Sequence, residues 1–523
     1  MKRTFVATSI GAVGLCAMLL VPQACTNLDE TPPSAITPGN FFRSEGEVLA
    51  ALAGVYAQLR GTLDDYYNVS EISTDEMVVP TRGQDWYDNG TWLELHRQQW
   101  TANSPGTLSF LNGAWNTAYS GIARANVLLD ALQGASVPNQ ASIEAEARTL
   151  RAFYYYLLLD LFGGVPVATT SEIAARPRVT RDSLFKFIES ELLAVRPDLP
   201  TTRNAANNGR ITQGAVDAIL ANLYINAGVF TKNDVPGGIN ATAYNSCAGI
   251  TVSGGVSACQ AAVTRADNVI SSGVYQLADS FVKNFRADNN LSPENIFVVK
   301  FADANDLGLN FVMRALHYNQ FNPSPWNGFA ALAQTYNAFS AADRRRNIFL
   351  VGPQSNVLTG VPVNDRAGNP LVFTVTIANV TSATEGEGPR VYKWPADPNH
   401  VAQNNGNDYA WFRLSEMYLI KAEAILDGAT GSPTPLTLVQ AVRARAFASD
   451  TLSAVTLPVI LRERLFEFTG EAKRRQDLIR FGAYTQPWEW KTGPEGQEPR
   501  RVLMPIPQGQ IDANPLLTQN NGY

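Results

Sequence analysis

The clearest regular pattern in this 523-residue chain is a helical one over residues 141–162. Apolar side chains recur there at alternating spacings of three and four, and the pattern stops at Gly163-Gly164 with Pro166 shortly after. Such spacing places them on one helix face, and glycine followed by proline is typical of a helix C-terminus. The face consists of Ala147, Leu150, Tyr154, Leu157 and Leu161. The chain must therefore bury at least one long amphipathic helix against other elements.

Five further segments show the same periodicity and are predicted to be helices. They cover residues 44–60, 106–133, 212–227, 409–426 and 458–481. The predicted helices come in pairs joined by short turns, which resembles tetratricopeptide packing, although no strict repeat of roughly 34 residues is visible. We expect a mostly α fold: a tetratricopeptide-like helical repeat body with loop-rich insertions and a few short strands.

Long stretches rich in glycine, asparagine and proline separate these helices. They cover residues 61–105, 232–260, 302–330 and 351–408. Strands are predicted only locally, at 296–300 and 371–377. Long irregular segments on a helical frame are usually functional surfaces or insertions. We therefore look for a ligand site in these loops.

The first 24 residues have the form of an export signal. Two basic residues precede an apolar run from Phe5 to Val21, which is marginal for a bilayer span and suits a cleaved signal. Ala24 directly before Cys25 suits cleavage followed by lipid attachment to the thiol. The alternative is ordinary cleavage with Cys25 incidental. No later segment is apolar for long enough to span a membrane, so the expected membrane attachment is by lipid alone.

Charge and residue counts argue against several classes of protein. The net charge is −6, and no Lys/Arg run is long enough to follow a phosphate backbone, so no nucleic-acid partner is expected. Only three histidines occur, far apart, so no multi-histidine metal site is expected.

Cys247 and Cys259 lie 12 residues apart in a Gly/Ser-rich stretch. In an oxidising compartment they are predicted to form a loop disulfide, and without a histidine beside them a zinc site is not expected.

The loop at residues 75–100 is the first candidate ligand site. It carries Trp86, Tyr87 and Trp92 together with Asn89. Apolar faces of sugar rings stack on exposed aromatic side chains, while amides and carboxylates bind the hydroxyl groups. The alternative is that the tryptophans pack the loop onto the helices.

The turn at residues 322–328 is the second candidate. Its prolines fix an extended turn that presents Trp326 at the tip, followed by Asn327. A purely structural turn is the alternative for this segment.

Three regularly spaced carboxylates give no sign of catalysis. Glu463, Glu467 and Glu471 recur at every fourth position of one predicted helix. A glycosidase needs two carboxylates that face each other across a cleft, about 5–9 Å apart. Lys and Arg side chains surround the three, so we interpret them as solvated ion pairs. The common hydrolase, zinc-protease, nucleotide and dinucleotide motifs are absent from the sequence, so no catalytic residue and no cofactor is expected.

Several segments, taken in order, resemble the SusD/RagB outer-membrane lipoproteins of glycan-uptake systems. The matching segments are Cys25–Pro32, Asn40–Phe42, Glu146–Pro166, Gly209–Tyr224, Trp411–Ala424, Val442–Gly482 and Met504–Tyr523. They are collinear and cover nearly all of the chain after the signal. The resemblance implies a mostly helical body with tetratricopeptide-like repeats and a loop-rich C-terminal half.

The role implied by this resemblance is nutrient capture at the cell surface. Such a lipoprotein of the bacterial outer membrane, lipid-anchored through Cys25, would bind oligosaccharide or polysaccharide and pass it to a SusC-like TonB-dependent transporter without catalysis. The expected regions are a signal peptide (1–24), an N-terminal helical region (25–230), an insertion with a linking helical region (231–290) and a C-terminal region (291–523). Two alternatives stay open: a surface glycoside hydrolase that uses acidic residues of the loops, and a protein-interaction scaffold built on helical repeats.

Overall fold

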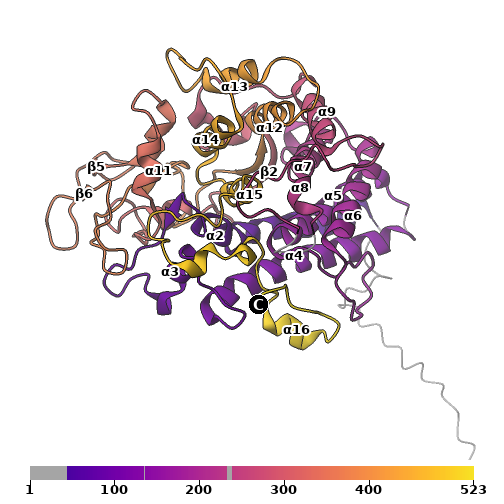
Figure 1. Cartoon of the computed structure of the whole chain (residues 1–523), viewed down its shortest axis with the longest axis horizontal. Coiled ribbons are helices and arrows are strands. Elements are labelled where there is room, and N and C mark those ends of the chain that lie inside the picture. The colour runs from indigo at the N-terminus through magenta and orange to yellow at the C-terminus, as the bar shows by residue number, and fades with distance from the viewer. Residues whose placement is uncertain (1–43, 135, 233–237) are drawn as a thin grey trace, which may run out of the picture. The chain divides into compact units, whose positions relative to one another are not determined.

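The computed structural model describes residues 44–134, 136–232 and 238–523 (Figure 1). The predicted signal peptide and Cys25 lie outside these ranges. Within them, none of the helices combines the length and the apolar character needed to cross a lipid bilayer.

Helices dominate the described chain, as predicted. In the N-terminal half they are α1 (Glu45–Ala57), α2 (Asp65–Ile72), α3 (Thr91–His96), α4 (Pro105–Leu132), α5 (Gln140–Phe162), α6 (Arg181–Val195), α7 (Gln213–Ile225), α8 (Ala227–Phe230) and α9 (Ala258–Ile270). In the C-terminal half they are α10 (Phe311–Ala315), α11 (Ala333–Ala338), α12 (Leu414–Leu426), α13 (Pro435–Arg443), α14 (Leu457–Phe468), α15 (Arg474–Arg480) and α16 (Gln508–Ala513). Helix α4 packs on α5, α5 on α6, α7 on α9, and α12 on both α9 and α13. This arrangement fits the predicted helical-repeat body.

The strands are short and pair antiparallel, two at a time. They are β1 (Met77–Val78), β2 (Asn295–Val299), β3 (Ala330–Ala331), β4 (Phe349–Leu350), β5 (Gly352–Pro353), β6 (Val372–Phe373), β7 (Arg390–Val391) and β8 (Tyr409–Arg413). The pairs are β1–β3, β2–β8, β4–β7 and β5–β6. Strands β5 and β6 lie with α11 on one side of the helices, in the loop-rich part of the chain (Figure 1). The strand predicted at 371–377 is thus reduced to two residues.

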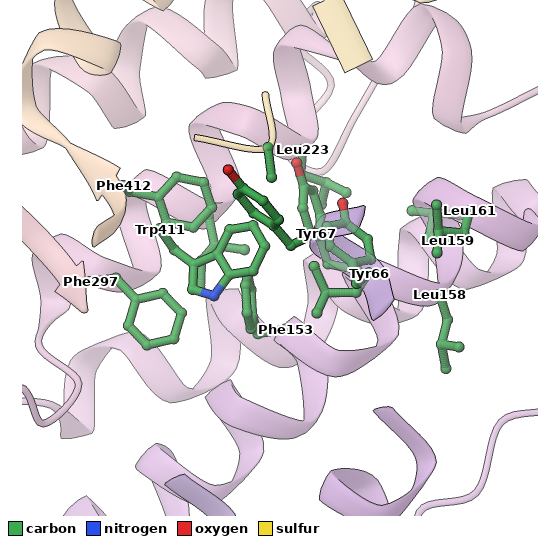
Figure 2. Packing of buried hydrophobic residues seen from close by; sticks show 14 of the residues in the cluster. Tyr66, Tyr67, Phe153, Leu158, Leu159, Leu161, Leu223, Phe297, Trp411 and Phe412 are labelled. Atoms are coloured by element: carbon green, nitrogen blue, oxygen red, sulfur yellow. The ribbon is translucent and has the colours of Figure 1, made fainter. Parts of the chain in front are cut away.

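The centre of the core lies where α5 meets β2 and β8. The five residues of the predicted α5 face are all buried. Phe153 of α5 points its ring at Phe297 of β2 and Trp411 of β8, with ring centroids 4.9 Å and 5.4 Å away (Figure 2). Edge-to-face contacts of this kind add to the free energy of burying the rings. The helical frame is therefore joined to the C-terminal half by aromatic packing.

Two predicted helices differ from the structure. Residues 409–413 are strand β8, and all five are buried. A strand buried on both faces shows no alternation, so periodicity cannot separate it from the helix that follows. The helix predicted at 458–481 is broken between α14 and α15, where Gly470 and Ala472 have positive φ. The main-chain N–H groups of these two residues donate to side chains instead of to helix carbonyls: that of Gly470 to the carboxyl group of Glu76, and that of Ala472 to the carboxyl group of Glu71.

The prediction that Glu463, Glu467 and Glu471 form solvated ion pairs is wrong, because all three are buried. Arg345 donates to Glu463 at 2.6 Å and to Glu467 at 3.0 Å. Arg413 donates to Glu467 at 3.0 Å and to Glu471 at 2.7 Å. A buried charge is tolerated only when it is paired in this way. The helix α14 is therefore fixed to β8 and to residues 344–348 by a buried ionic network.

Cys247 and Cys259 are joined by a disulfide that ties the loop before α9 to the first turn of that helix. In the described residues, the cluster whose geometry suits a metal ion consists of these two cysteines and Asp427. Because both sulfurs are in the disulfide, neither is a thiolate that could bind a metal.

Candidate functional site

Three loops from distant parts of the sequence meet at one surface, which we call the loop surface. They are residues 79–90, 317–328 and 365–388. The N–H of Thr81 donates to the carbonyl of Val380 at 3.0 Å. The indole N–H of Trp86 donates to the carbonyl of Trp326 at 2.6 Å. The two candidate segments of the sequence are therefore neighbours in the fold.

Two buried arginines hold these loops together. Arg82 donates to the main-chain carbonyls of Asn327 at 3.0 Å and Glu387 at 2.8 Å, and also to that of Thr384. Arg390 donates to the carbonyls of Glu385 and Glu387, both at 2.8 Å. Burial lowers the pKa of Arg82 to about 10 and lowers the pKa of Arg390 well below its ordinary value. Both guanidinium groups act as multiple hydrogen-bond donors to the loop backbone.

The indole of Trp86 is held in place from several sides. A Cβ atom on Gly328 would lie 2.4 Å from its Cζ2 atom, so the ring rests on the glycine backbone. The rings of Trp92 and Phe329 meet it edge to face, at centroid distances of 5.4 Å and 6.0 Å. Trp86 nevertheless stays partly exposed. Its position is thus fixed before any ligand arrives.

The backbone around Trp86 adopts an unusual conformation. Trp86, Asp88 and Asn89 have φ values of 61°, 37° and 53°. Non-glycine residues in this region carry a strain of about 1–3 kcal/mol each, and such strain gathers at binding and active sites. The loop is kept in this form by contacts such as the hydrogen bond from the N–H of Gly90 to the carbonyl of Tyr87, at 2.6 Å. A strained, well-supported loop is consistent with a ligand-binding role.

Four of the six predicted ligand residues are at the surface. Tyr87 is 57% exposed, which makes its ring the most accessible aromatic group of the loop surface. Asn89 is exposed, and Trp86 and Trp326 are partly exposed.

The other two predicted ligand residues, Trp92 and Asn327, need correction. Trp92 is 7% exposed, and its indole N–H donates to Asp88 at 2.6 Å. Asn327 is fully buried, with its amide oxygen accepting from Arg390 at 2.8 Å and its amide nitrogen donating to the carbonyl of Glu385 at 3.1 Å. Their polar atoms are satisfied inside the protein, so both are structural residues: Asn327 lies within the loop surface, and Trp92 of α3 packs beneath it.

A network of polar residues on the loop surface was not predicted from the sequence. The hydroxyl of Tyr318 donates to Asp85, and Arg366 lies 3.1 Å from Asp85 and is ion-paired with Glu385. The Arg366 guanidinium also stacks over the Tyr318 ring, 4.2 Å from its centroid. These residues come from all three loops, and no motif marks them. Their location in long loops is the one signal that the sequence offers.

The charge states in this network are firmly set. Partial burial alone would raise the pKa of Glu385, but hydrogen bonds from the Arg366 main chain, from His317 and from the Arg366 side chain bring it to about 2. Burial, together with the hydrogen bond to Asp85, raises the pKa of Tyr318 to about 12. At neutral pH Glu385 is therefore an anion and Tyr318 a hydrogen-bond donor.

A hollow of about 450 Å³ opens beside this network. Its lining includes Arg82, Asp365, Arg366, Thr384 and Glu385. The volume lies in the usual range for small-molecule sites, and the lining is rich in groups that bind hydroxyls. The loop surface thus combines an aromatic ring, a fixed indole and a polar hollow.

A second hollow, of about 520 Å³, lies between α1, residues 207–210 and β2. Its α1 wall is mainly aliphatic, and the hydroxyl of its one aromatic side chain, Tyr56, donates to Glu146 at 2.6 Å. This hollow presents no pair of accessible rings in its lining. For a sugar-type ligand the loop surface is the better match.

Three carboxylates of the segment 75–100 are already engaged. Asp75 is ion-paired with Arg474 at 2.7 Å, and Glu76 is buried and accepts from the N–H of Gly470 at 3.0 Å. Asp85 is shared between Tyr318 and Arg366. A pair of free carboxylates facing across an open cleft, as a glycosidase requires, is not found among these residues.

Two family models match the chain. Residues 293–523 match the SusD family model, and residues 27–225 match a model described as starch-binding associating with outer membrane. The starch-binding protein SusD of Bacteroides thetaiotaomicron is 26% identical over the whole of both chains. SusD-like protein P25 of Formosa agariphila is 25% identical over 95% of this chain and 96% of its own length.

Solved structures share the fold. A laminarin binding SusD-like protein superposes with a TM-score of 0.72 at 21% identity, covering 92% of this chain and all of that one. Surface glycan-binding protein A from Bacteroides thetaiotaomicron, in complex with laminarihexaose, gives a TM-score of 0.70 at 23% identity, with 91% of this chain and all of that one covered.

Proposed function

The chain belongs to the SusD/RagB family, and from this we propose that it is a carbohydrate-binding protein of the bacterial outer membrane that binds glycan at the loop surface, without catalysis. It would then deliver the glycan to a SusC-like TonB-dependent transporter. Two similar proteins carry names that describe starch binding and glycan binding, and this supports a carbohydrate as the ligand. The engaged state of the loop carboxylates supports binding without hydrolysis.

The observation that carries the proposal is the pairing of a fixed indole with an accessible ring. Trp86 is held by Trp326 and Gly328, and its neighbour Tyr87 is 57% exposed. A preorganised aromatic surface binds a sugar ring without first losing side-chain entropy. Weak capture, with a Kd of roughly micromolar to millimolar, would suit a protein that must release its ligand to a transporter.

We further propose that the mature protein is tethered through a lipid on Cys25. A tether would keep it beside the transporter at an effective concentration of roughly millimolar. The regions 25–230, 231–290 and 291–523 remain our proposed division, and the two family models end and begin near its boundaries. Metabolic labelling with a palmitate analogue tests the anchor: label that persists in a Cys25→Ser variant would count against it.

Calorimetry with a panel of neutral polysaccharides tests glycan binding. We expect heat of binding for at least one polymer, a loss of at least tenfold in affinity for Tyr87→Ala, and retained affinity for the matched Tyr87→Phe variant. The polymer should stay uncut on product analysis. Cleavage would establish the hydrolase alternative. Absence of binding across the panel would favour the scaffold alternative, with a transporter complex that survives Tyr87→Ala.

A further inference from the structure

The loop surface carries more acidic than basic groups. Its three loops contain five carboxylates, two arginines and one histidine. The carboxylates are Asp85, Asp88, Asp365, Glu385 and Glu387. Each is at least partly exposed. The basic residues are Arg82, Arg366 and His317.

Two of the three basic groups, Arg82 and His317, are not available to an anionic ligand. Arg82 is 2% exposed and its donors are bound to loop carbonyls. His317 is buried, which lowers its pKa, so it is neutral at pH 7. Arg390, next to the third loop, is fully buried and bound to carbonyls as well. The accessible cation is Arg366, whose side chain is 52% exposed.

Arg366 is already neutralised by two carboxylates. It lies 3.1 Å from Asp85 and is ion-paired with Glu385, which also accepts from its main-chain N–H at 3.0 Å. An incoming carboxylate or sulfate would meet a guanidinium whose Nε and Nη2 already donate to Glu385 and Asp85 and whose charge those two carboxylates already balance. It would also approach Asp88 and Asp365, which are of like charge.

We propose that the loop surface selects neutral glycans and rejects glycans that carry carboxylate or sulfate groups. The hydroxyl groups of a neutral sugar are hydrogen-bond donors, and carboxylate oxygens accept them well. A uronate or sulfate ester brings only further acceptors and a like charge. This inference rests on the proposed function of the same surface.

The test compares one polymer in two charge states, with the full chain as the protein. Calorimetry with laminarin, or with whichever neutral polymer binds in the panel, is run beside the same polymer partly carboxymethylated. We expect the neutral polymer to bind at least fivefold more tightly at 0.1 M NaCl. The ratio should move toward one at 1 M NaCl, because the screening length falls from about 10 Å to about 3 Å.

Charge variants then locate the effect. The double variant Asp85→Asn with Glu385→Gln should lower the ratio of the two affinities at least twofold. Glu172→Gln removes an exposed carboxylate outside the loop surface and should leave the ratio unchanged. The ratio is compared within each variant, so a general loss of affinity does not disturb it. If the double variant does not fold, the comparison of the two affinities at 0.1 M and 1 M NaCl, made on the unmodified chain, tests the proposal by itself.

The outcomes separate the two proposals. Equal or tighter binding of the carboxymethylated polymer would overturn the selection for neutral glycans and leave glycan binding in place. A ratio that stays fixed in the double variant, or at 1 M NaCl, would equally overturn it. If neither polymer binds, the proposed function fails and this inference fails with it.

Discussion

The indole N–H of Trp86 donates a 2.6 Å hydrogen bond to the main-chain carbonyl of Trp326, 240 residues further along the chain. This bond joins the two loops that carry the aromatic residues of the candidate site. Trp86 therefore supports the surface and also forms part of it. A Trp86 variant alone would change stability and binding together, so sharper variants are needed.

Gly328→Ala should displace the Trp86 ring. Its new Cβ atom would lie 2.4 Å from Cζ2 of Trp86, and such overpacking lowers the free energy of unfolding by about 1–3 kcal/mol. We expect a shift in tryptophan fluorescence and a weaker affinity for glycan. Gly249→Ala, whose Cβ atom meets nothing within 4 Å, is the matched control. A Gly328→Ala protein with unchanged fluorescence and affinity would contradict this view of the site.

Arg82→Met should loosen the loop surface while the helices stay intact. The change removes the hydrogen bonds to the carbonyls of Asn327, Thr384 and Glu387. Each carbonyl left buried without a partner lowers stability by about 1–3 kcal/mol. Hydrogen exchange should accelerate in residues 384–388 and remain slow in α5. Arg286→Met, at an exposed ion pair, should leave both regions unchanged; equal acceleration in α5 would point to global destabilisation instead.

Arg413→Met should destabilise the fold strongly. Arg413 is fully buried and donates to Glu294, Glu467 and Glu471. Removing one member of a buried ionic network leaves charges uncompensated and lowers the free energy of unfolding by about 3–5 kcal/mol. Urea denaturation measures the change. Lys186→Met, at an exposed pair with Asp182, should change it by less than about 0.5 kcal/mol. A similar small effect for Arg413→Met would show that the network contributes little.

Glu76→Gln should stabilise the protein more at pH 8 than at pH 5. Burial raises the pKa of Glu71 to about 7. Burial also raises the pKa of Glu76 well above its ordinary value, and the negative charge of the nearby Glu71 raises the pKa of Glu76 further. The folded chain therefore keeps protons that the unfolded chain loses above about pH 4.5, so stability falls as the pH rises through this range. Glutamine retains the acceptor for the N–H of Gly470 and does not ionise.

The difference between Glu76→Gln and the unmodified chain should grow with pH by at most about 1.4 kcal/mol per unit. Urea denaturation at pH 5, 6, 7 and 8 measures it. A difference that is independent of pH would mean that the buried pair does not hold an extra proton.

Local patterns were enough to predict the long helices, because their apolar spacing depends only on near neighbours. Helix α5 begins and ends within one residue of its prediction. Strand β8 was missed because a strand buried on both faces shows no alternating pattern. The burial of Glu463 was missed for a different reason: its partner Arg345 lies 118 residues away. Contacts at such separations are not visible in a local pattern.

The candidate site was predictable only in part, because local composition identifies the loop but not which of its side chains are exposed. Tyr87 stood out as an aromatic residue in a polar loop, and the structure leaves it exposed. The same argument placed Trp92 at the surface, although the fold buries it. Arg366 acquires its place only when its loop meets Asp85, 281 residues away. Composition indicates which loops matter, and the fold decides which of their side chains face a ligand.

Arg82 and Arg390 bind their neighbouring loops largely by donating hydrogen bonds to main-chain carbonyls. Every amino acid has such a carbonyl, whatever its side chain. The attachment therefore places few demands on the side chains it holds. The hydrogen bonds to the carbonyls of residues 384, 385 and 387 do not depend on which side chains those positions carry. The two arginines thus anchor the loop through its main chain, while the side chains of the loop determine which ligand it binds. Substitutions of exposed loop side chains can therefore change the ligand specificity without removing these anchoring bonds.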